Sequence, residues 1–211
     1  MPADLIHLVR HAEVHNPDGI LYGRLEGFHL SELGFQMAEV AAESFEGRTI
    51  TRLYASPLQR AQESAQPWAQ RFDLEVHTDE RLIEPTNWFE GRTFEFPGAL
   101  RHPAAWPKLA NPLKPSWGEP YKQVLARMRS VASAAYHATP GGEVVLVSHQ
   151  MPIVTFTRAA ARRTLVHNPA RRRCSLSSIT TFEVVDGAFR EVSYAEPASE
   201  LLADAVDEGA V

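Results

Sequence analysis

Two arginines and two histidines of this sequence are placed where they could act together on an anion. Each lies at the end of an apolar run or in the helix expected after one: Arg10, His11, Arg60 and His149. Arginine offers a planar fork of donors that fits phosphate oxygens, and a neutral histidine nitrogen is a nucleophile at physiological pH. Any one of these residues alone is better explained by a structural role, but the four together predict an anion site with a nucleophile.

The elements that would hold these residues alternate between strands and helices. Apolar runs predict strands over residues 5–9, 49–55 and 144–147. Hydrophobic spacing predicts helices from the N-cap Ser31 to about 47, and over about 57–72, 120–137 and 152–161. Residues 178–185 and 189–194 predict a hairpin across Asp186-Gly187. This order favours an α/β fold with a parallel sheet at its centre, where ligands bind at the carboxyl ends of the strands.

Composition limits the class of protein. The chain has 211 residues with 44% hydrophobic residues, which suits one globular domain rather than a disordered chain. No apolar run is long enough to cross a bilayer, and no secretory signal is evident, so we expect no membrane partner. The single cysteine, Cys174, excludes an intramolecular disulfide and a cysteine metal cluster. A cytoplasmic location is therefore expected.

Charge is spread unevenly along the chain. Five acidic residues fall within 196–211, and the remainder carries 21 acidic and 21 basic residues. We expect a single domain over 1–195 and a flexible acidic tail over 196–211. A neutral body argues against nucleic acid as a partner. The exception is the segment 158–173, with six arginines, which could be a solvated helix face, a border of the site that attracts anions, or a surface for nucleic acid or a phosphoprotein; the first is favoured.

A long segment interrupts the alternation of strands and helices. Residues 93–119 are rich in proline and carry four aromatic residues, namely Phe94, Phe96, Trp106 and Trp117. Long loops inside compact domains usually serve as lids or binding loops. We expect a lid-like insertion that favours a partly apolar or ring-bearing leaving group, and the alternative is a surface insertion with no role.

Three stretches carry a resemblance to a known family: Val9-Arg10-His11-Ala12-Glu13, Ser56-Pro57-Leu58-Gln59-Arg60-Ala61 and Val147-Ser148-His149-Gln150. In order and spacing they resemble the motifs of the histidine phosphatase superfamily, in its phosphoglycerate mutase-like branch 1. Further matches lie at Gly23-Arg24, residues 30–34, Leu82-Ile83-Glu84 with residues 88–91, and Gly118-Glu119. The resemblance spans residues 5 to about 185 and implies a three-layer α/β/α sandwich with a mostly parallel central sheet.

The resemblance also implies a mechanism. His11 would attack a phosphate monoester and form a phosphohistidine, while Arg10, Arg60 and His149 hold the phosphoryl oxygens. Glu84 would protonate the leaving oxygen and then activate water, which requires a raised pKa. No metal and no other cofactor is implied. The residues expected around the substrate, besides Arg10, Arg60 and His149, are Gln150, Tyr22, Arg24 and Asn16.

The sequence departs from the family pattern at four positions. Ala12 and Gln150 stand where the family usually has glycine, and Met37 stands where it often has glutamine. Ala12 lacks glycine's easy access to positive φ. The spacing from Arg10 to Asn16 is one residue short, which weakens Asn16 as a phosphate ligand. None of these changes removes a proposed catalytic group.

Hydrolysis of a small phosphate monoester is favoured over mutase-type phosphoryl transfer. Mutases of the family are usually longer and have more basic substrate contacts, whereas residues 93–119 carry only Arg101, Lys108 and Lys114 as cations. A binding module without catalysis could dispense with His11 or Glu84, and both are present. A phosphoprotein phosphatase is a third alternative, against which the long loop argues. The sequence specifies neither the substrate nor the oligomeric state.

Overall fold

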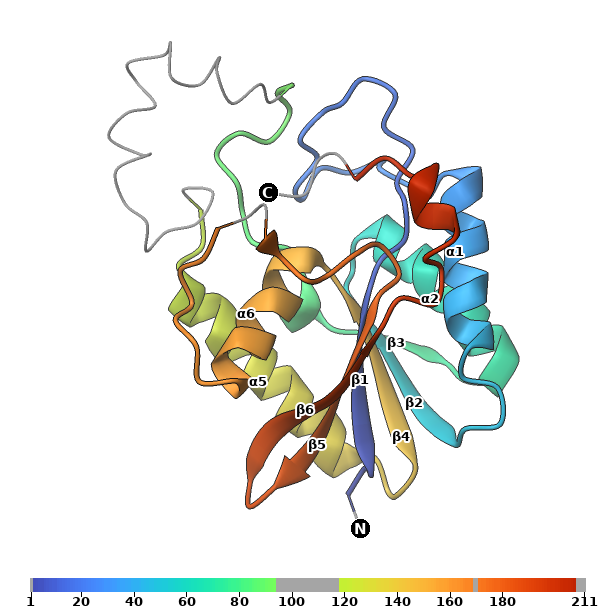
Figure 1. Ribbon diagram of the computed structural model, residues 1–211, viewed down its shortest axis with the longest axis vertical. Helices are drawn as coiled ribbons and strands as arrows, with labels where there is room; N and C mark the ends of the chain where they lie inside the picture. The colour runs from blue at the N-terminus through green and yellow to red at the C-terminus, as the bar shows by residue number, and fades with distance from the viewer. Residues whose placement is uncertain (1, 94–117, 169–170, 208–211) are drawn as a thin grey trace.

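A six-stranded mixed sheet forms the centre of the molecule in this computed structural model, which describes residues 2–93, 118–168 and 171–207 (Figure 1). The strand order is β3-β2-β4-β1-β5-β6. The first four strands of that order are parallel, and β5 and β6 form an antiparallel hairpin at one side. The strands are β1 (Leu5–Arg10), β2 (Ile50–Ala55), β3 (Val76–Thr78), β4 (Glu143–Ser148), β5 (Ile179–Val185) and β6 (Ala188–Ala195).

Two pairs of helices cover the two faces of the sheet, which gives three layers (Figure 1). On one face lie α1 (Glu32–Glu43) and α2 (Gln59–Phe72), and on the other lie α5 (Tyr121–Ala138) and α6 (Gln150–Ala160). Each face has its own apolar core. Leu8 and Leu146 pack toward Met128 of α5, whereas Val145 and Val147 pack toward Trp68 of α2. The predicted α/β/α sandwich is confirmed.

Local signals explain several boundaries. The Ser31 side chain accepts a hydrogen bond from the Gly34 backbone N–H and so caps α1, as its sequence position predicted. A Cβ atom at Gly34 would lie 2.1 Å from the Glu13 carbonyl oxygen, so glycine is required for the helix to approach the loop after β1. The turn between β5 and β6 has Asp186 at φ 51° and Gly187 at φ 74°, which confirms the predicted hairpin.

The start of α6 differs from the prediction. The helix begins at Gln150 rather than at Pro152, and His149 is its N-cap residue. Proline is compatible with the first turn because the backbone N–H groups there have no partner within the helix. The shift matters, because it places His149 directly where β4 ends and α6 begins.

The acidic C-terminal segment, for which we expected a flexible tail over 196–211, is described as far as residue 207. Residues 196–207 pack along α1 and include the 3-10 turn η5 (Leu201–Ala203). Ala198 is buried against a cluster that includes Leu30, Met37 and Leu176. A few apolar residues among the acids therefore anchor the segment. Residues 94–117, which contain the four aromatic residues of the expected lid, lie outside the described residues.

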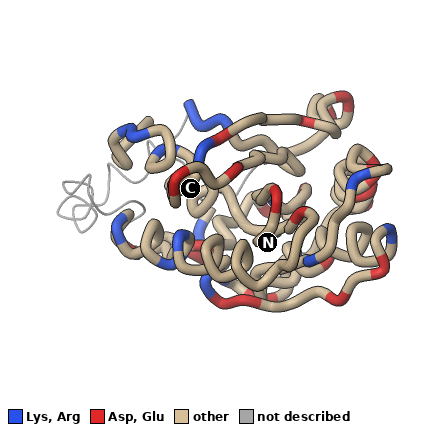
Figure 2. The backbone as a smooth tube through the Cα atoms, turned by 90° about the horizontal axis from the view of Figure 1, so that it is seen from below, with Lys and Arg blue, Asp and Glu red and all other residues tan. Residues whose placement is uncertain are grey.

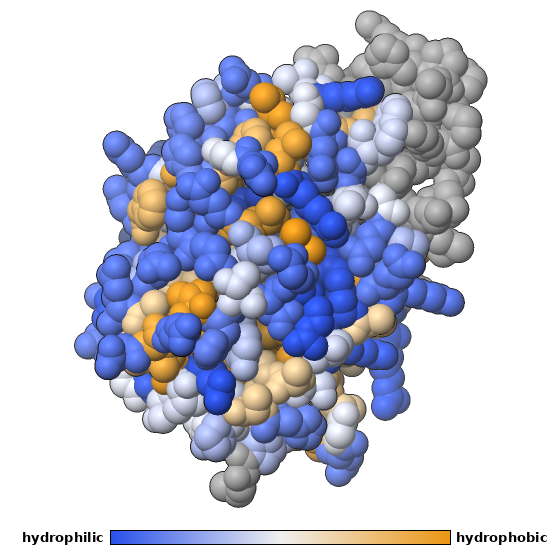
Figure 3. Space-filling model, turned by 180° about the vertical axis from the view of Figure 1, so that it is seen from behind, coloured by the Kyte–Doolittle hydropathy of each residue, from blue (hydrophilic) through white to orange (hydrophobic). Residues whose placement is uncertain are grey.

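The surface is mixed in character. Basic and acidic positions are interspersed along much of the chain in Figure 2, and apolar side chains form separated patches among polar ones on the face in Figure 3. Across the three described ranges, no helix is long and apolar enough to cross a membrane.

Candidate active site

The sheet brings the predicted residues to one edge. Arg10 pairs with Ser148 in the register of β1 and β4, so the residues that follow these two parallel strands, His11 and His149, are neighbours. Their ring centroids are 5.2 Å apart. Arg60 joins them from the first turn of α2, and Glu84 from the loop after the 3-10 turn η1 (Glu80–Leu82). Side chains from four separate segments thus form one cluster, which we call the histidine–arginine cluster.

His11 has one ring nitrogen fixed and the other without a hydrogen-bond partner among the described residues. Its Nδ1 lies 2.8 Å from the backbone oxygen of Ala12 and donates a hydrogen bond to it. Burial, followed by the charges of Arg60 and Arg10, holds the pKa of His11 well below its usual range. The ring is therefore neutral at physiological pH, and Nε2 carries a free lone pair.

His149 is held by the residue that precedes α2. Its Nε2 shares a hydrogen bond of 2.7 Å with the Ser56 hydroxyl. The other nitrogen, Nδ1, lies 4.0 Å from a carboxyl oxygen of Glu84. Burial and then the charge of Arg60 hold the pKa of His149 well below its usual range. Both histidines of the cluster are consequently uncharged.

Both arginines are almost completely buried, with relative exposures of 0% for Arg10 and 1% for Arg60. Arg60 donates from Nη2 to the Gly23 carbonyl at 2.7 Å, and its guanidinium lies 4.6 Å from the centre of the Tyr22 ring. Burial lowers the pKa of Arg60. Two buried guanidinium groups close to neutral histidines make this cluster electropositive.

Arg10 pairs with a carboxylate from the far end of the chain. Its Nη1 donates to the Cys174 carbonyl at 2.7 Å and to Asp207 at 2.8 Å, and Nη2 donates to the second oxygen of Asp207. Burial opposes the charge, but the Asp207 carboxylate outweighs it and raises the pKa of Arg10. Sequence analysis missed Asp207, because no local signal connects it with Arg10.

Three nitrogens of the cluster are buried without a hydrogen-bond partner in the described part of the chain. They are Nε of Arg10, Nε of Arg60 and Nδ1 of His149. Buried polar atoms are normally paired, so several unpaired nitrogens in one cluster call for an explanation. An anion bound in the cluster would supply acceptors for such donors.

Glu84 has the raised pKa that its expected role requires. Burial raises the pKa of Glu84 to about 7, against the opposing charges of Arg60, Arg127, Arg172 and Arg10. Its backbone carbonyl accepts a 2.6 Å hydrogen bond from Nε of Arg24. Near neutral pH this carboxyl group can both hold and release a proton.

Three of the remaining predicted residues lie beside the cluster, and the fourth, Asn16, is not shown to join it. Tyr22 is buried beside Arg60, and Arg24 contacts Glu84 through the backbone. Gln150 accepts a 2.9 Å hydrogen bond from Arg172. Both ends of the Asn16 amide bond to the Ile20 backbone, so in this structure Asn16 braces its own loop.

Two further features bear on the site. Ala12 lies outside the left-handed region, so its replacement of glycine causes no backbone strain there. Arg172 belongs to the basic segment 158–173, and its contact with Gln150 and charge interaction with Glu84 place it at the border of the cluster. The sequence had suggested such a border as one of three interpretations, although not this residue.

Within the described residues, no group of three or more His, Cys, Asp or Glu side chains could hold a metal ion. His7 and His15 lie four residues before and four residues after His11 in the sequence, and each has partners of its own. His7 bonds to Thr181 and Glu143, and His15 stacks on His29.

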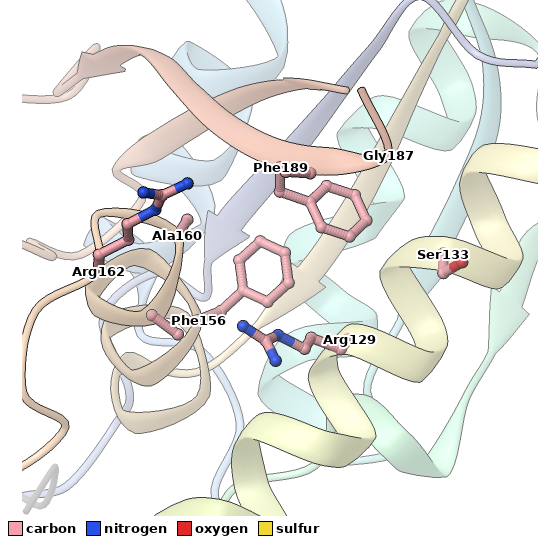
Figure 4. Close-up of a pocket in the computed structure, with 9 residues that line it drawn as sticks. Arg129, Ser133, Phe156, Ala160, Arg162, Gly187 and Phe189 are labelled. Atoms are coloured by element: carbon pink, nitrogen blue, oxygen red, sulfur yellow. The ribbon is translucent and has the colours of Figure 1, made fainter. Parts of the chain in front are cut away.

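A cavity of about 440 Å³ lies apart from the cluster, between α5, α6 and the turn of the β5–β6 hairpin (Figure 4). Phe156 and Phe189 lie at its centre, with Arg129 and Arg162 to the sides. It includes none of the predicted site residues. The residues expected to carry the chemistry therefore lie in the cluster at the sheet edge and not at this cavity.

Comparisons with known proteins agree with this geometry. The model of the histidine phosphatase superfamily (branch 1) matches residues 6–197. Rv0525, an uncharacterized protein of Mycobacterium tuberculosis, is 48% identical over 195 residues, which cover 92% of this chain and 96% of that protein. The structure of a mycobacterial glucosyl-3-phosphoglycerate phosphatase with VO3 has a TM-score of 0.75 at 27% identity and covers 90% of this chain and 97% of that one.

A shorter match covers part of a mutase. A 2,3-bisphosphoglycerate-dependent phosphoglycerate mutase of Thermoplasma acidophilum is 42% identical over 78 residues, which cover 36% of this chain and 39% of the mutase. The family match extends over most of the chain, and the 48% identical relative spans nearly all of it. The chain therefore belongs to the histidine phosphatase superfamily, branch 1.

Proposed function

We propose that this protein is a metal-independent phosphatase that hydrolyses a small phosphate monoester through a phosphohistidine on His11. The observation that carries the proposal is the set of unpaired nitrogens on Arg10, Arg60 and His149 in the cluster that contains a neutral His11. A phosphoryl group supplies acceptor oxygens for these donors and an electrophilic phosphorus for the imidazole. A cluster with these partners is suited to phosphoryl transfer.

In the first step, Nε2 of His11 attacks phosphorus with its free lone pair. The bond between phosphorus and the ester oxygen breaks, and the electron pair of that bond stays on the leaving oxygen. Protonated Glu84 gives its proton to this oxygen, so the product leaves as an alcohol. Arg10, Arg60 and His149 stabilise the negative charge on the phosphoryl oxygens in the transition state.

In the second step, Glu84 is a carboxylate and takes a proton from water as the water oxygen attacks phosphorus. The bond between Nε2 and phosphorus breaks, and its electron pair returns to His11 as the lone pair. Inorganic phosphate leaves, and Glu84 is again protonated. A pKa of about 7 suits both roles, because neither form of the carboxyl group is strongly favoured at neutral pH.

Hydrolysis is favoured over transfer to a second substrate. The phosphatase structure with a TM-score of 0.75 covers 90% of this chain, whereas the mutase match covers 36%. The small number of cations in residues 93–119 also favours hydrolysis. Mutase-type transfer remains the alternative, and it requires a bound acceptor that competes with water.

Phosphate release from a broad panel of phosphate monoesters, with a metal chelator present, tests the proposal. We expect turnover by the native protein that resists the chelator and is lost in His11→Ala. A radiolabelled phosphoryl group should be trapped on the native protein as an acid-labile, alkali-stable adduct, as a phosphohistidine requires. Turnover that survives His11→Ala, or a trapped adduct on another residue, would refute the proposed nucleophile.

A further inference from the structure

The C-terminal segment places a carboxylate on the innermost arginine of the cluster. Asp207 bonds to both terminal nitrogens of Arg10, across 197 positions of sequence. We propose that Asp207 is a specificity-determining residue that competes with the phosphoryl group of the substrate for Arg10. This inference rests on the proposed function in one respect, namely that Arg10 is a ligand of the phosphoryl group.

The contact occupies both terminal nitrogens of Arg10, beside the unpaired Nε on which a phosphoryl group would first find a donor. Two parallel bonds from Nη1 and Nη2 form the fork that arginine offers to carboxylates and phosphates alike. With Asp207 in place, Nε is the nitrogen of Arg10 that has no partner among the described residues. The side chain of Arg10 is 0% exposed and that of Asp207 is 42% exposed. The carboxylate therefore lies between Arg10 and solvent, and a phosphoryl group can use the fork only after displacing it.

The backbone of the segment is anchored up to Asp207 by contacts that do not involve Arg10, among them the packing of Ala205. Ala198 is buried and Leu201 and Leu202 pack on the same cluster, far from Arg10 in sequence. Next to Asp207, the Val206 backbone N–H donates a 2.6 Å hydrogen bond to Glu13. Among described residues, Arg10 is the hydrogen-bond partner of the Asp207 carboxylate. The carboxylate can thus leave Arg10 while the apolar anchors of the segment stay packed.

Charge decides which ligands can displace Asp207. A carboxylate brings one negative charge, whereas a phosphate monoester brings close to two at neutral pH. A phosphoryl group also finds donors on Arg60 and His149 that Asp207 leaves unpaired. An anion with a single charge gains less from the exchange. Dianionic phosphoryl groups therefore displace Asp207 more readily than carboxylates or sulfate monoesters, which carry a single charge.

Phosphate binding to matched variants tests this inference. Asp207→Asn keeps the size of the side chain and removes its charge, and Asp204→Asn removes the same charge from an exposed neighbour. Calorimetric titration of each protein with inorganic phosphate and with methyl sulfate, a tetrahedral anion of single charge, at constant ionic strength gives the dissociation constants. If Asp207 occupies Arg10 in nine of ten native molecules, the apparent constant is raised about tenfold.

We expect Asp207→Asn to bind phosphate about tenfold more tightly than the native protein and to gain at least as much for methyl sulfate. Asp204→Asn should match the native protein. Thermal unfolding checks that each variant is folded, and Asp207→Ser serves as a second variant if Asp207→Asn is not. Phosphate binding that is unchanged or weaker in a folded Asp207 variant would overturn the inference, because Asp207 would then support Arg10 rather than compete for it.

The same proteins separate this inference from the proposed function. Turnover that depends on His11, combined with unchanged phosphate binding in Asp207→Asn, would leave the phosphatase intact and refute competition by Asp207. Tighter binding in Asp207→Asn without turnover by any protein would support the competition and refute the phosphatase.

Discussion

Nδ1 of His149 lies 4.0 Å from a carboxyl oxygen of Glu84, and burial shifts the pKa of each group toward its uncharged form. Below about pH 7 the two therefore meet mainly as neutral groups. A protonated imidazole at this distance would stabilise the Glu84 carboxylate and lower its pKa. Because His149 is neutral, Glu84 keeps a proton that it can give to a leaving oxygen.

The rate should depend on the protonation of Glu84. The pKa of Glu84 is raised to about 7, so the acid form exists below that pH and is lost above it. For an alkyl phosphate, kcat/KM should fall as the pH rises through about 7. Because the pKa of His11 is held well below its usual range, the nucleophile should stay neutral over the same interval. Measurement of kcat/KM from about pH 5 to about pH 9 checks this.

Leaving-group dependence isolates the role of Glu84 as an acid. Glu84→Gln should lower kcat/KM for an alkyl phosphate by about 10²–10⁴-fold, because the alkoxide must then leave without a proton. For p-nitrophenyl phosphate, whose leaving group needs no proton, the loss in the phosphorylation step should be much smaller. Equal losses for both substrates in a pre-steady-state measurement of that step would contradict the assignment.

The same residue should lower stability at alkaline pH. A folded-state pKa raised above the unfolded value contributes stability below the unfolded pKa, and this is lost as the pH rises through about 7. The side chain of Glu84→Gln carries no charge, so the Tm of this variant should exceed that of the native protein at pH 8. The expected difference is about 2–4 °C for each kcal/mol of unfolding free energy that the charge of Glu84 costs. The difference should shrink toward pH 5. A constant difference across this range would mean that the charge of Glu84 is not the cause.

Arg60 should not tolerate lysine. Its guanidinium donates to Gly23 and lies over the Tyr22 ring, and lysine offers neither the planar fork nor the same stacking. Arg60→Lys should lower kcat/KM by about 10²–10³-fold. Arg71→Lys is a matched control on the same helix, since Arg71 pairs with Glu39 at the surface. Comparable losses in both variants would indicate a general effect on α2 rather than a lost contact with substrate.

Gly34 should be required for the contact between α1 and the loop that follows β1. A Cβ there would overlap the Glu13 carbonyl oxygen, so Gly34→Ala should cost about 1–3 kcal/mol of unfolding free energy. Chemical denaturation of this variant, compared with Gln36→Ala on the exposed side of the same helix, measures that cost. A variant as stable as the native protein would show that the loop moves aside freely.

Local signals explain what could be predicted from the sequence. The apolar runs before His11 and His149 are buried strands because neither face of the sheet is open to water, and the predicted cluster follows from their parallel order. The start of α6 was predicted two residues too late because Pro152 was expected to be the first residue of the helix. Proline is tolerated anywhere in the first turn, so its position does not fix the start. Such errors shift a boundary by one or two residues and leave the topology unchanged.

Contacts between distant parts of the chain could not be predicted in this way. Asp207 lies in a stretch whose acidic composition suggested flexibility, and its partner is 197 positions away. The apolar residues that anchor the stretch, such as Ala198, Leu201 and Leu202, are too few to mark it as folded. Asn16 was expected near the substrate from the family resemblance, although its spacing from Arg10 is one residue short, and in this structure its amide bonds to the Ile20 backbone. Both cases depend on side-chain partners rather than on periodicity.

The strand that carries the nucleophile lies inside the sheet, and this has a consequence for local unfolding. β1 is paired with β4 on one side and β5 on the other, and the backbone N–H groups of Arg10 and His11 bond to Ser178 and Ser148. Such amides exchange with deuterated solvent only when the central sheet opens. We therefore expect their protection to approach that of global unfolding, and heat inactivation to coincide with the loss of the fold.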